Sequence, residues 1–446
     1  MRWIMLGLFV ALPLQWFALG STPLGTARLH QIAILSVAAI VLARYRPQVH
    51  TPLVRTAMGF LVANIFLLTV WAAVDVYNAT KPAGPIQQFL YVAAFLALGT
   101  MFYRAASGAE SGLVGILRWA ALATCVSVVL GFAASMAVNG VNPAAVLAKT
   151  VAAADPELLQ KEVFKSSFAS FGLDAETVAG NLRHEIFGAV LLAMYVSTWA
   201  MRVGNPASFA QRIGYQAAMI TGTVLLAVSL SRSILIAAIV WPVIAFWRSV
   251  LLGRLSSRQL AMAFVSVAGI GLLLLSGFGQ VIWNRFTTDT TGYGSREDNY
   301  VVAFSELRDH WLTGGVVTNG VNASTHNFVL DSWLRGGLFT GLAAAAVFAL
   351  VGLVWLRLVM RIHHQPDWMV PVVAALALPL VRMGTAGGGL IPPVAWVALA
   401  FVAGLLAMRQ EQAELSTLTL ASSRPERGQG GQEVREVPAA RRFSQA

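Results

Sequence analysis

Residues 211–249 read QRIGYQAAMITGTVLLAVSLSRSILIAAIVWPVIAFWRS. Two apolar runs, 211–230 and 233–249, are separated by a turn of minimal length, Ser231-Arg232-Ser233. A helix needs about 20 residues to cross the roughly 30 Å hydrocarbon core of a bilayer, and each run is close to that length. The stretch therefore predicts two transmembrane helices joined by a tight turn that carries Arg232.

The rest of the chain has the same apolar character. Of its 446 residues, 57% are hydrophobic and only 11% are charged, and the mean hydropathy is +0.68. Soluble domains carry about 25% charged residues, and this much apolar side chain would form large exposed patches in water. The apolar runs are long and continuous rather than alternating, so helices are expected and not barrel strands.

We expect an all-α polytopic membrane protein of about 12 transmembrane helices. The first span follows Met1-Arg2 and resembles a signal peptide as far as Leu19, but we expect it to be retained as a helix. The candidate spans are approximately 3–20, 27–43, 54–74, 86–103, 113–138, 186–203, 211–230, 233–249, 260–278, 337–356, 369–385 and 391–408.

Arginines recur in every second connection between these spans. The positive-inside rule places this set in the cytoplasm, and Arg2 puts the N-terminus on the same side. The set also explains the basic composition, with its net charge of +11, so no nucleic-acid partner is expected. Its members are Arg44, Arg46, Arg55, Arg104, Arg202, Arg212, Arg248, Arg254, Arg258, Arg357, Arg361 and Arg409.

Two long connections, 139–185 and 279–336, fall on the opposite, non-cytoplasmic side. A loop of such length in a compact protein is usually functional or disordered. The second one is rich in aromatic residues and is expected to be ordered, with an amphipathic helix over 296–311 that places Tyr300, Phe304, Leu307 and Trp311 on one stripe. Residues 1–410 are expected to form one transmembrane domain, and the polar remainder, 411–446, a disordered cytoplasmic tail.

Arginines on the non-cytoplasmic side need a separate explanation, because the positive-inside rule does not place them there. The short turn holds Arg232 near the membrane–water boundary, where an unpaired charge is costly. Its side chain could reach lipid phosphates, or it could bind a substrate phosphate bidentately through its planar guanidinium. The charged and imidazole side chains on this side include Arg183, His184, Arg232, Arg285, Arg296, His326, Arg335 and Arg382.

His326 and Arg296 are candidates within the second long connection. A surface ion pair with the neighbouring acidic residues would also explain Arg296, and a lone histidine is more often structural than catalytic. His326 stands shortly before the span that begins at Gly337, and nearby arginines would favour the neutral imidazole that a general base needs. The sequence has no cluster of His, Cys and Asp with the spacing of metal ligands.

Several short motifs, taken in order, resemble the O-antigen ligase/polymerase superfamily. The resemblance of topology covers most of the chain, and that of the motifs covers about 231–341. The family often has Gly-x-Gly before its histidine segment, where this chain has Gly314-Gly315-Val316. The motifs are Ser231-Arg232-Ser233, Gly294-Ser295-Arg296, Gly314-Gly315, His326-Asn327-Phe328-Val329-Leu330 and Gly336-Gly337-Leu338-Phe339-Thr340-Gly341.

The resemblance implies a GT-C-like glycosyltransferase, with 1–410 as its catalytic domain, in the bacterial inner membrane. It would take a glycan from undecaprenyl diphosphate on the periplasmic side, among membrane lipids. By the family pattern, Arg232 and Arg296 match diphosphate-binding arginines and His326 matches the catalytic histidine. The other candidates for substrate binding are Arg183, His184, Arg285, Asn327 and Arg382.

The chemistry of the donor agrees with this implication. A diphosphate is a good leaving group, and arginines would stabilise the charge that develops on it. A base that takes the proton of the acceptor hydroxyl would allow direct attack with inversion of the anomeric centre. No metal or other cofactor is expected.

The sequence does not identify the acceptor. A ligase would use the lipid A-core oligosaccharide, a polymerase another carrier-linked repeat, and a protein O-oligosaccharyltransferase a serine hydroxyl. A transporter or flippase is the alternative that is not an enzyme. Transporters tend to bind substrate near the midplane through broken helices and repeats, whereas the polar residues here gather at one face.

Overall fold

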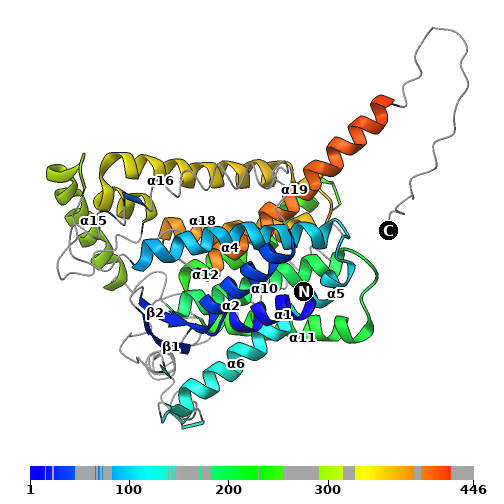
Figure 1. The fold of residues 1–446 in the computed structure, drawn as a ribbon, viewed down its shortest axis with the longest axis horizontal. Helices are drawn as coiled ribbons and strands as arrows, with labels where there is room; N and C mark the ends of the chain where they lie inside the picture. The colour runs from blue at the N-terminus through cyan, green and yellow to red at the C-terminus, as the bar shows by residue number, and fades with distance from the viewer. Residues whose placement is uncertain are drawn as a thin grey trace, which may run out of the picture. The chain divides into compact units, whose positions relative to one another are not determined.

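The computed structural model is built mostly of helices (Figure 1). It describes residues 1–15, 17–22, 25–45, 83–138, 182–229, 231–254, 291–314, 327–385 and 393–422, together with a few short stretches between them. The elements are α1 (Arg2–Ala11), β1 (Phe17–Thr22), β2 (Gly25–Arg28), α2 (Leu29–Arg44), α4 (Ala83–Ala106), α5 (Ser111–Leu117), α6 (Ala120–Val138), β3 (Phe171–Gly172), α10 (Leu182–Arg202), α11 (Phe209–Val228), α12 (Arg232–Leu251), α15 (Thr291–His310), α16 (Phe328–Met360), η2 (Ile362–His364), α17 (Met369–Ala375), α18 (Ala377–Thr385) and α19 (Pro393–Ser422).

Five helical segments in the described part are long and apolar enough to cross a membrane. The structure is therefore mostly helical, and these segments agree with a polytopic membrane protein. The predicted spans 54–74 and 260–278 lie almost wholly outside the described residues, so the number of twelve stays a prediction. The five segments are Gly112–Val138, His184–Arg202, Ser233–Leu251, Phe328–Met360 and Pro393–Ser416.

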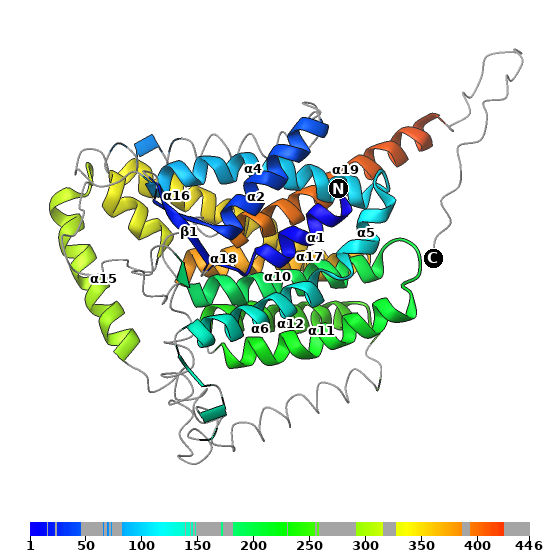
Figure 2. The ribbon, with the colours of Figure 1, turned by 60° about the horizontal axis from the view of Figure 1, so that its bottom comes forward.

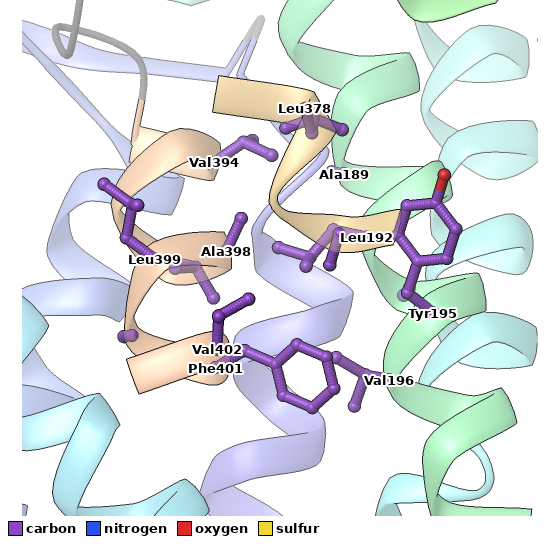
Figure 3. Packing of buried hydrophobic residues seen from close by; sticks show 14 of the residues in the cluster. Ala189, Leu192, Tyr195, Val196, Leu378, Val394, Ala398, Leu399, Phe401 and Val402 are labelled. Carbon is purple, nitrogen blue, oxygen red and sulfur yellow. The ribbon is translucent and has the colours of Figure 1, made fainter. Parts of the chain in front are cut away.

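Helix α10 forms the centre of the bundle and packs against α6, α11, α12 and α17 (Figure 2). Its side chains from Ile186 to Ala200 are all buried, as expected for a helix that is apolar on every side. The Trp199 ring meets Phe401 of α19 edge to face, with 5.7 Å between ring centroids. Figure 3 shows Val196 of the same helix close to Phe401, and Leu378 of α18 beside Ala189.

Helices α12 and α16 instead expose large apolar side chains. Ile239, Val243 and Phe246 of α12 and Leu350 and Leu353 of α16 are all exposed in the bare protein. Such a surface is unstable in water and is stable against lipid tails. The inward burial of α10 and the outward apolar faces of α12 and α16 together fit a bundle that lies in a bilayer.

The prediction of one continuous helix over 3–20 is wrong in its second half. Helix α1 ends at Ala11, and the chain then forms strands β1 and β2, which pair antiparallel. Strand β3 joins β1 in parallel, so the small sheet has the order β2-β1-β3. Pro13 explains the early end of the helix, because it has no backbone N–H and its ring clashes with the preceding helical turn.

The C-terminal boundary also differs from the expectation of a disordered tail from 411. Helix α19 continues to Ser422. Gln410 Nε2 donates to Glu414 Oε1 at 3.0 Å, a contact between side chains one helical turn apart. Residues 423–446 lie outside the described part.

Two arginines of the set that was assigned to the cytoplasm meet at one end of the bundle. Arg202 at the end of α10 donates to the Asp367 carbonyl oxygen at 2.7 Å. Arg248 near the end of α12 pairs with the Asp367 carboxylate at 2.6 Å and donates to the Gln365 carbonyl at 3.0 Å. Asp367 lies in the connection after α16, so three connections assigned to one side by sequence are in contact.

Candidate functional site

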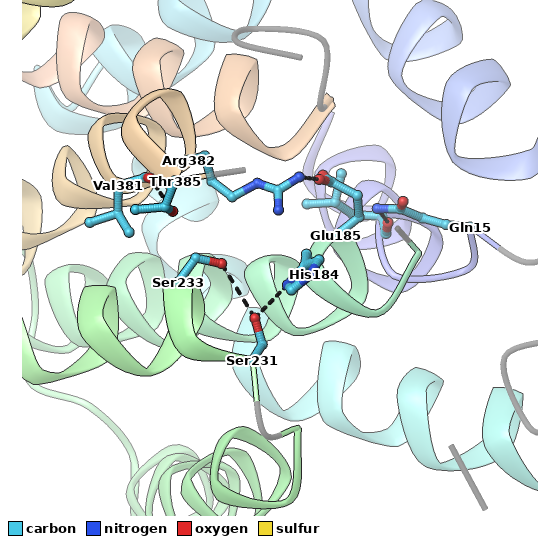
Figure 4. Close-up of polar contacts among 9 residues, drawn as sticks. Gln15, His184, Glu185, Ser231, Ser233, Val381, Arg382 and Thr385 are labelled. Atoms are coloured by element: carbon cyan, nitrogen blue, oxygen red, sulfur yellow. Dashed lines mark hydrogen bonds and ion pairs between the residues drawn. The ribbon is translucent and has the colours of Figure 1, made fainter. Parts of the chain in front are cut away.

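The opposite end of the bundle carries a buried polar network that joins the first turns of α10 and α12. His184 Nδ1 and Ser231 Oγ lie 2.5 Å apart, and Ser231 Oγ lies 3.3 Å from Ser233 Oγ (Figure 4). Both serines are buried. The tight turn between α11 and α12 thereby becomes fixed to the start of α10.

Ser231 stands at the N-cap of α12, where a serine normally accepts a hydrogen bond from a backbone N–H of the first turn. Here its backbone is extended, with φ −84° and ψ 107°, and its side chain makes no such cap bond. The hydroxyl is directed to His184 instead. The first N–H groups of α12 therefore keep their partial positive charge free of a serine cap, at the point where Arg232 begins the helix.

A buried ion pair lies beside this network. Arg382 of α18 donates through Nη2 to Glu185 Oε1 of α10, and the two residues are 8% and 9% exposed. Among the described residues, Arg382 Nη1 has no hydrogen-bond partner although it is buried. The carboxylate thus uses one arm of the guanidinium and leaves the other unpaired.

Eight residues were predicted for the site, and the structure places four of them at this end of the bundle. His184 and Arg382 lie in the polar network and the adjoining ion pair, and the backbones of Arg183 and Arg232 lie in the first turns of α10 and α12. The side chains of Arg183 and Arg232 are not among the described ones.

The remaining predicted residues belong to the second long connection and the helix after it. Arg296 lies in α15, which packs on α16, but its side chain is not described. Arg285 and His326 lie outside the described residues. Asn327 is the N-cap of α16, and its Oδ1 accepts from the N–H groups of Val329 at 3.0 Å and Leu330 at 3.1 Å. The side-chain oxygen of Asn327 thus serves the helix, which was not anticipated.

The glycine motifs on either side of His326 have a physical reason. Helix α16 is interrupted at Gly337, where φ is +77°, and Gly314 at the end of α15 has φ +63°. A Cβ on Gly314 would lie 2.2 Å from Gly337 N, so only glycine permits this approach. Trp333 Nε1 donates to the Trp311 carbonyl at 2.7 Å and ties the same two segments. The segment 315–336, which contains His326, therefore begins and ends at this contact between α15 and α16.

Several polar residues near the ion pair were missed by sequence reasoning. Arg28 donates through Nη1 to the Gln15 carbonyl at 2.6 Å, and the Tyr91 hydroxyl lies within electrostatic range of both Arg28 and Glu185. Arg28 stands at the start of the second predicted span, 27–43, on the side where the positive-inside rule does not expect arginine, so the same argument could have found it. Glu185 had a weaker signal, an acidic residue at the start of an apolar run.

The comparison with protein-family models gives no match for this chain, and the comparison with curated proteins gives none either. In the described part of the chain no three His, Cys, Asp or Glu side chains gather as metal ligands would. The described groups at this end carry positive charge or partial positive charge. They are the N-terminus of α12, which lacks a side-chain cap, the unpaired Nη1 of Arg382, and the first turns of α10 and α12, which contain Arg183 and Arg232. Such groups suit an anion, and phosphate oxygens in particular.

Proposed function

We propose that the chain is a glycosyltransferase that moves O-antigen glycan from undecaprenyl diphosphate to the lipid A-core oligosaccharide, which is the reaction of an O-antigen ligase. The observation that carries the proposal is the meeting of Arg382, His184 and the first turn of α12, headed by Arg232, at one end of the bundle. That end lies opposite the contacts of Arg202 and Arg248 with Asp367. By the positive-inside rule it faces the periplasm of the bacterial inner membrane.

In this proposal the donor diphosphate binds at the cationic end and its lipid lies in the bilayer. Arg232 and Arg296 hold the phosphates, with Arg183, Arg285, His184 and Arg382 as further contacts. The arginines stabilise the negative charge that grows on the diphosphate as the bond to the sugar breaks. Arg suits the task because it stays charged when desolvated and binds phosphate oxygens in pairs.

The transfer itself needs one proton acceptor. The acceptor hydroxyl oxygen attacks the anomeric carbon, its proton passes to His326, and the electron pair of the broken bond leaves with the diphosphate. A single displacement of this kind inverts the anomeric centre. The arginines supply the positive charge, so the proposal assigns no metal to the reaction.

A polymerase would use the same donor and the same chemistry, so the acceptor is what an experiment has to identify. The lipopolysaccharide of a deletion strain supplies the test. Loss of all long-chain glycan on lipid A, with polymer retained on the carrier, supports the ligase. Lipopolysaccharide with a single repeat indicates the polymerase, and unchanged lipopolysaccharide with a loss of glycosylated protein indicates a protein O-oligosaccharyltransferase.

The transporter alternative has less support. The buried side chains of α10 between Ile186 and Val196 are apolar apart from Tyr195, whose hydroxyl donates to the Ala237 carbonyl at 2.9 Å. The polar network lies instead at the start of this helix. A transporter would have its substrate groups near the midplane.

A further inference from the structure

The ion pair of Arg382 and Glu185 is formed through one arm only. Arg382 Nη2 donates to Glu185 Oε1, and both residues are buried. An arginine that serves only to neutralise a carboxylate typically forms two parallel hydrogen bonds with it. Here the second arm, Nη1, has no partner among the described residues.

A buried donor without a partner costs free energy, so such groups call for an explanation. The direction of Nη1 supplies one. Figure 4 shows that this arm points away from the carboxylate and toward the side where Ser233 and His184 lie. Ser233 belongs to the first turn of α12, whose N–H groups carry partial positive charge. Two cationic features of different origin, from α18 and α12, thus face the same space.

The carboxylate determines how this guanidinium is presented. Glu185 stands in the first turn of the central helix α10, next to His184. Its Oε1 accepts from Nη2 of Arg382 and so fixes a guanidinium that could otherwise rotate. It also neutralises the cation in the absence of a ligand, which makes burial of the charge tolerable.

We infer that Glu185 is a positioning residue, which holds Arg382 end-on so that Nη1 donates to a phosphate oxygen of a polyprenyl diphosphate. The inference rests on the proposed function and names the part of the site that takes the phosphate. When the donor binds, the guanidinium acquires a second acceptor and its unpaired arm is satisfied. Glu185 itself touches no reacting atom.

The test measures binding of undecaprenyl diphosphate to the full chain in detergent, with thermal unfolding as a check of the fold. Arg382→Lys keeps the charge that pairs with Glu185 but loses the second arm. It should unfold near the wild-type temperature and bind about ten-fold more weakly. Glu185→Asp keeps the pair but withdraws the guanidinium by one methylene, and it should raise KM for the donor several-fold with kcat preserved.

Arg248→Lys is the matched control. Arg248 is also ion-paired and lies at the other end of the bundle, on Asp367, so its replacement should leave donor binding unchanged. Wild-type affinity in folded Arg382→Lys overturns the inference. If that variant does not fold, wild-type KM in Glu185→Asp overturns it equally.

The outcomes also separate this inference from the proposed function. A wild-type protein that binds undecaprenyl diphosphate through Arg382 but transfers no glycan contradicts the proposed function and leaves the binding site intact. A protein that transfers glycan and is indifferent to both substitutions contradicts the binding site alone.

Discussion

Gly314 and Gly337 touch backbone to backbone, and both have positive φ angles, of 63° and 77°. A Cβ on Gly337 would lie 2.1 Å from the Leu312 carbonyl oxygen. The contact joins the end of α15 to the interruption of α16, and the amide of Leu338 donates to the same Leu312 carbonyl at 3.3 Å. This junction holds both ends of the segment 315–336, in which the proposed base stands.

Gly337→Ala should therefore destabilise the protein and reduce transfer. A left-handed conformation costs a residue with a Cβ about 1–2 kcal/mol, and the overlap with Leu312 adds to that cost. Gly352→Ala in the same helix is the control, because its Cβ would meet nothing closer than Leu380 at 3.9 Å. Thermal unfolding in detergent checks the pair, and equal stability of the two variants would contradict the proposed role of the junction.

Because His184 and Ser231 are in contact, substitutions at the two residues should have coupled effects on donor binding. Removing the imidazole leaves the buried Ser231 hydroxyl without this hydrogen bond, at a cost of about 1–3 kcal/mol. Removing either side chain loosens the turn that carries Arg232. His184→Ala and Ser231→Ala should each weaken donor binding about ten-fold, and the double variant should be no worse than either. Thr223→Ala removes an exposed hydroxyl that donates to the Met219 carbonyl within α11, and it should have no effect. Additive losses would show that the two residues act independently.

The contacts of Arg202 and Arg248 lead to a prediction about orientation. Reporter fusions after about residues 205, 255 and 363 should report the cytoplasm, and fusions near 160 and 310 the periplasm. Alkaline phosphatase and fluorescent-protein fusions measure the two sides. A cytoplasmic signal at 310 would place α15 on the wrong side for a lipid-linked periplasmic donor and would contradict the proposed function.

The proposed binding of the donor phosphates by Arg232 and Arg296 can be tested by substitutions that conserve charge. Arg232→Lys and Arg296→Lys keep the positive charge and lose the planar fork, so both should lose most of their transfer activity. The measurement is the initial rate at saturating acceptor. Near-normal turnover in Arg232→Ala would mean that this residue only contacts lipid headgroups.

Much of the architecture could be predicted because hydropathy reports directly on burial in lipid. The start of α12 next to Ser231 and the restart of a helix at Gly337 agree with the spans expected at 233 and 337. The first helix ends before Pro13, within an apolar run that hydropathy alone predicts to be one continuous helix. Strand β1, which follows, begins with Phe17, Ala18 and Leu19, and hydropathy alone could not separate these residues from the end of a span.

The faces of helices were harder to predict than their positions. Helix α15 was expected over 296–311 and occupies Thr291–His310. Within the apolar stripe that was predicted for it, Leu307 is buried and Tyr300 packs beside it, whereas Phe304 is 61% exposed. Ala303, which was not assigned to the stripe, is buried with Leu307. The rotation of a helix depends on what packs against it, and that information lies elsewhere in the chain.

The ion pair of Glu185 with Arg382 shows the same limit for the site. The two residues are 197 positions apart, and no local pattern couples them. Sequence reasoning identified Arg382 and His184 because they stand where the positive-inside rule disfavours charge. It missed the carboxylate between them, because an acidic residue on that side is unremarkable.

Glycan transfer by the purified protein and by its His326→Ala variant tests the proposed function most directly. Donor is undecaprenyl-diphosphate-linked glycan, acceptor is lipid A-core, and donor binding is followed in parallel. General-base catalysis contributes roughly 10²–10⁴-fold, so the variant should lose turnover by about that factor while it keeps its fold and its affinity for donor. Wild-type turnover in His326→Ala, or no transfer to lipid A-core by the wild-type protein, would contradict the account.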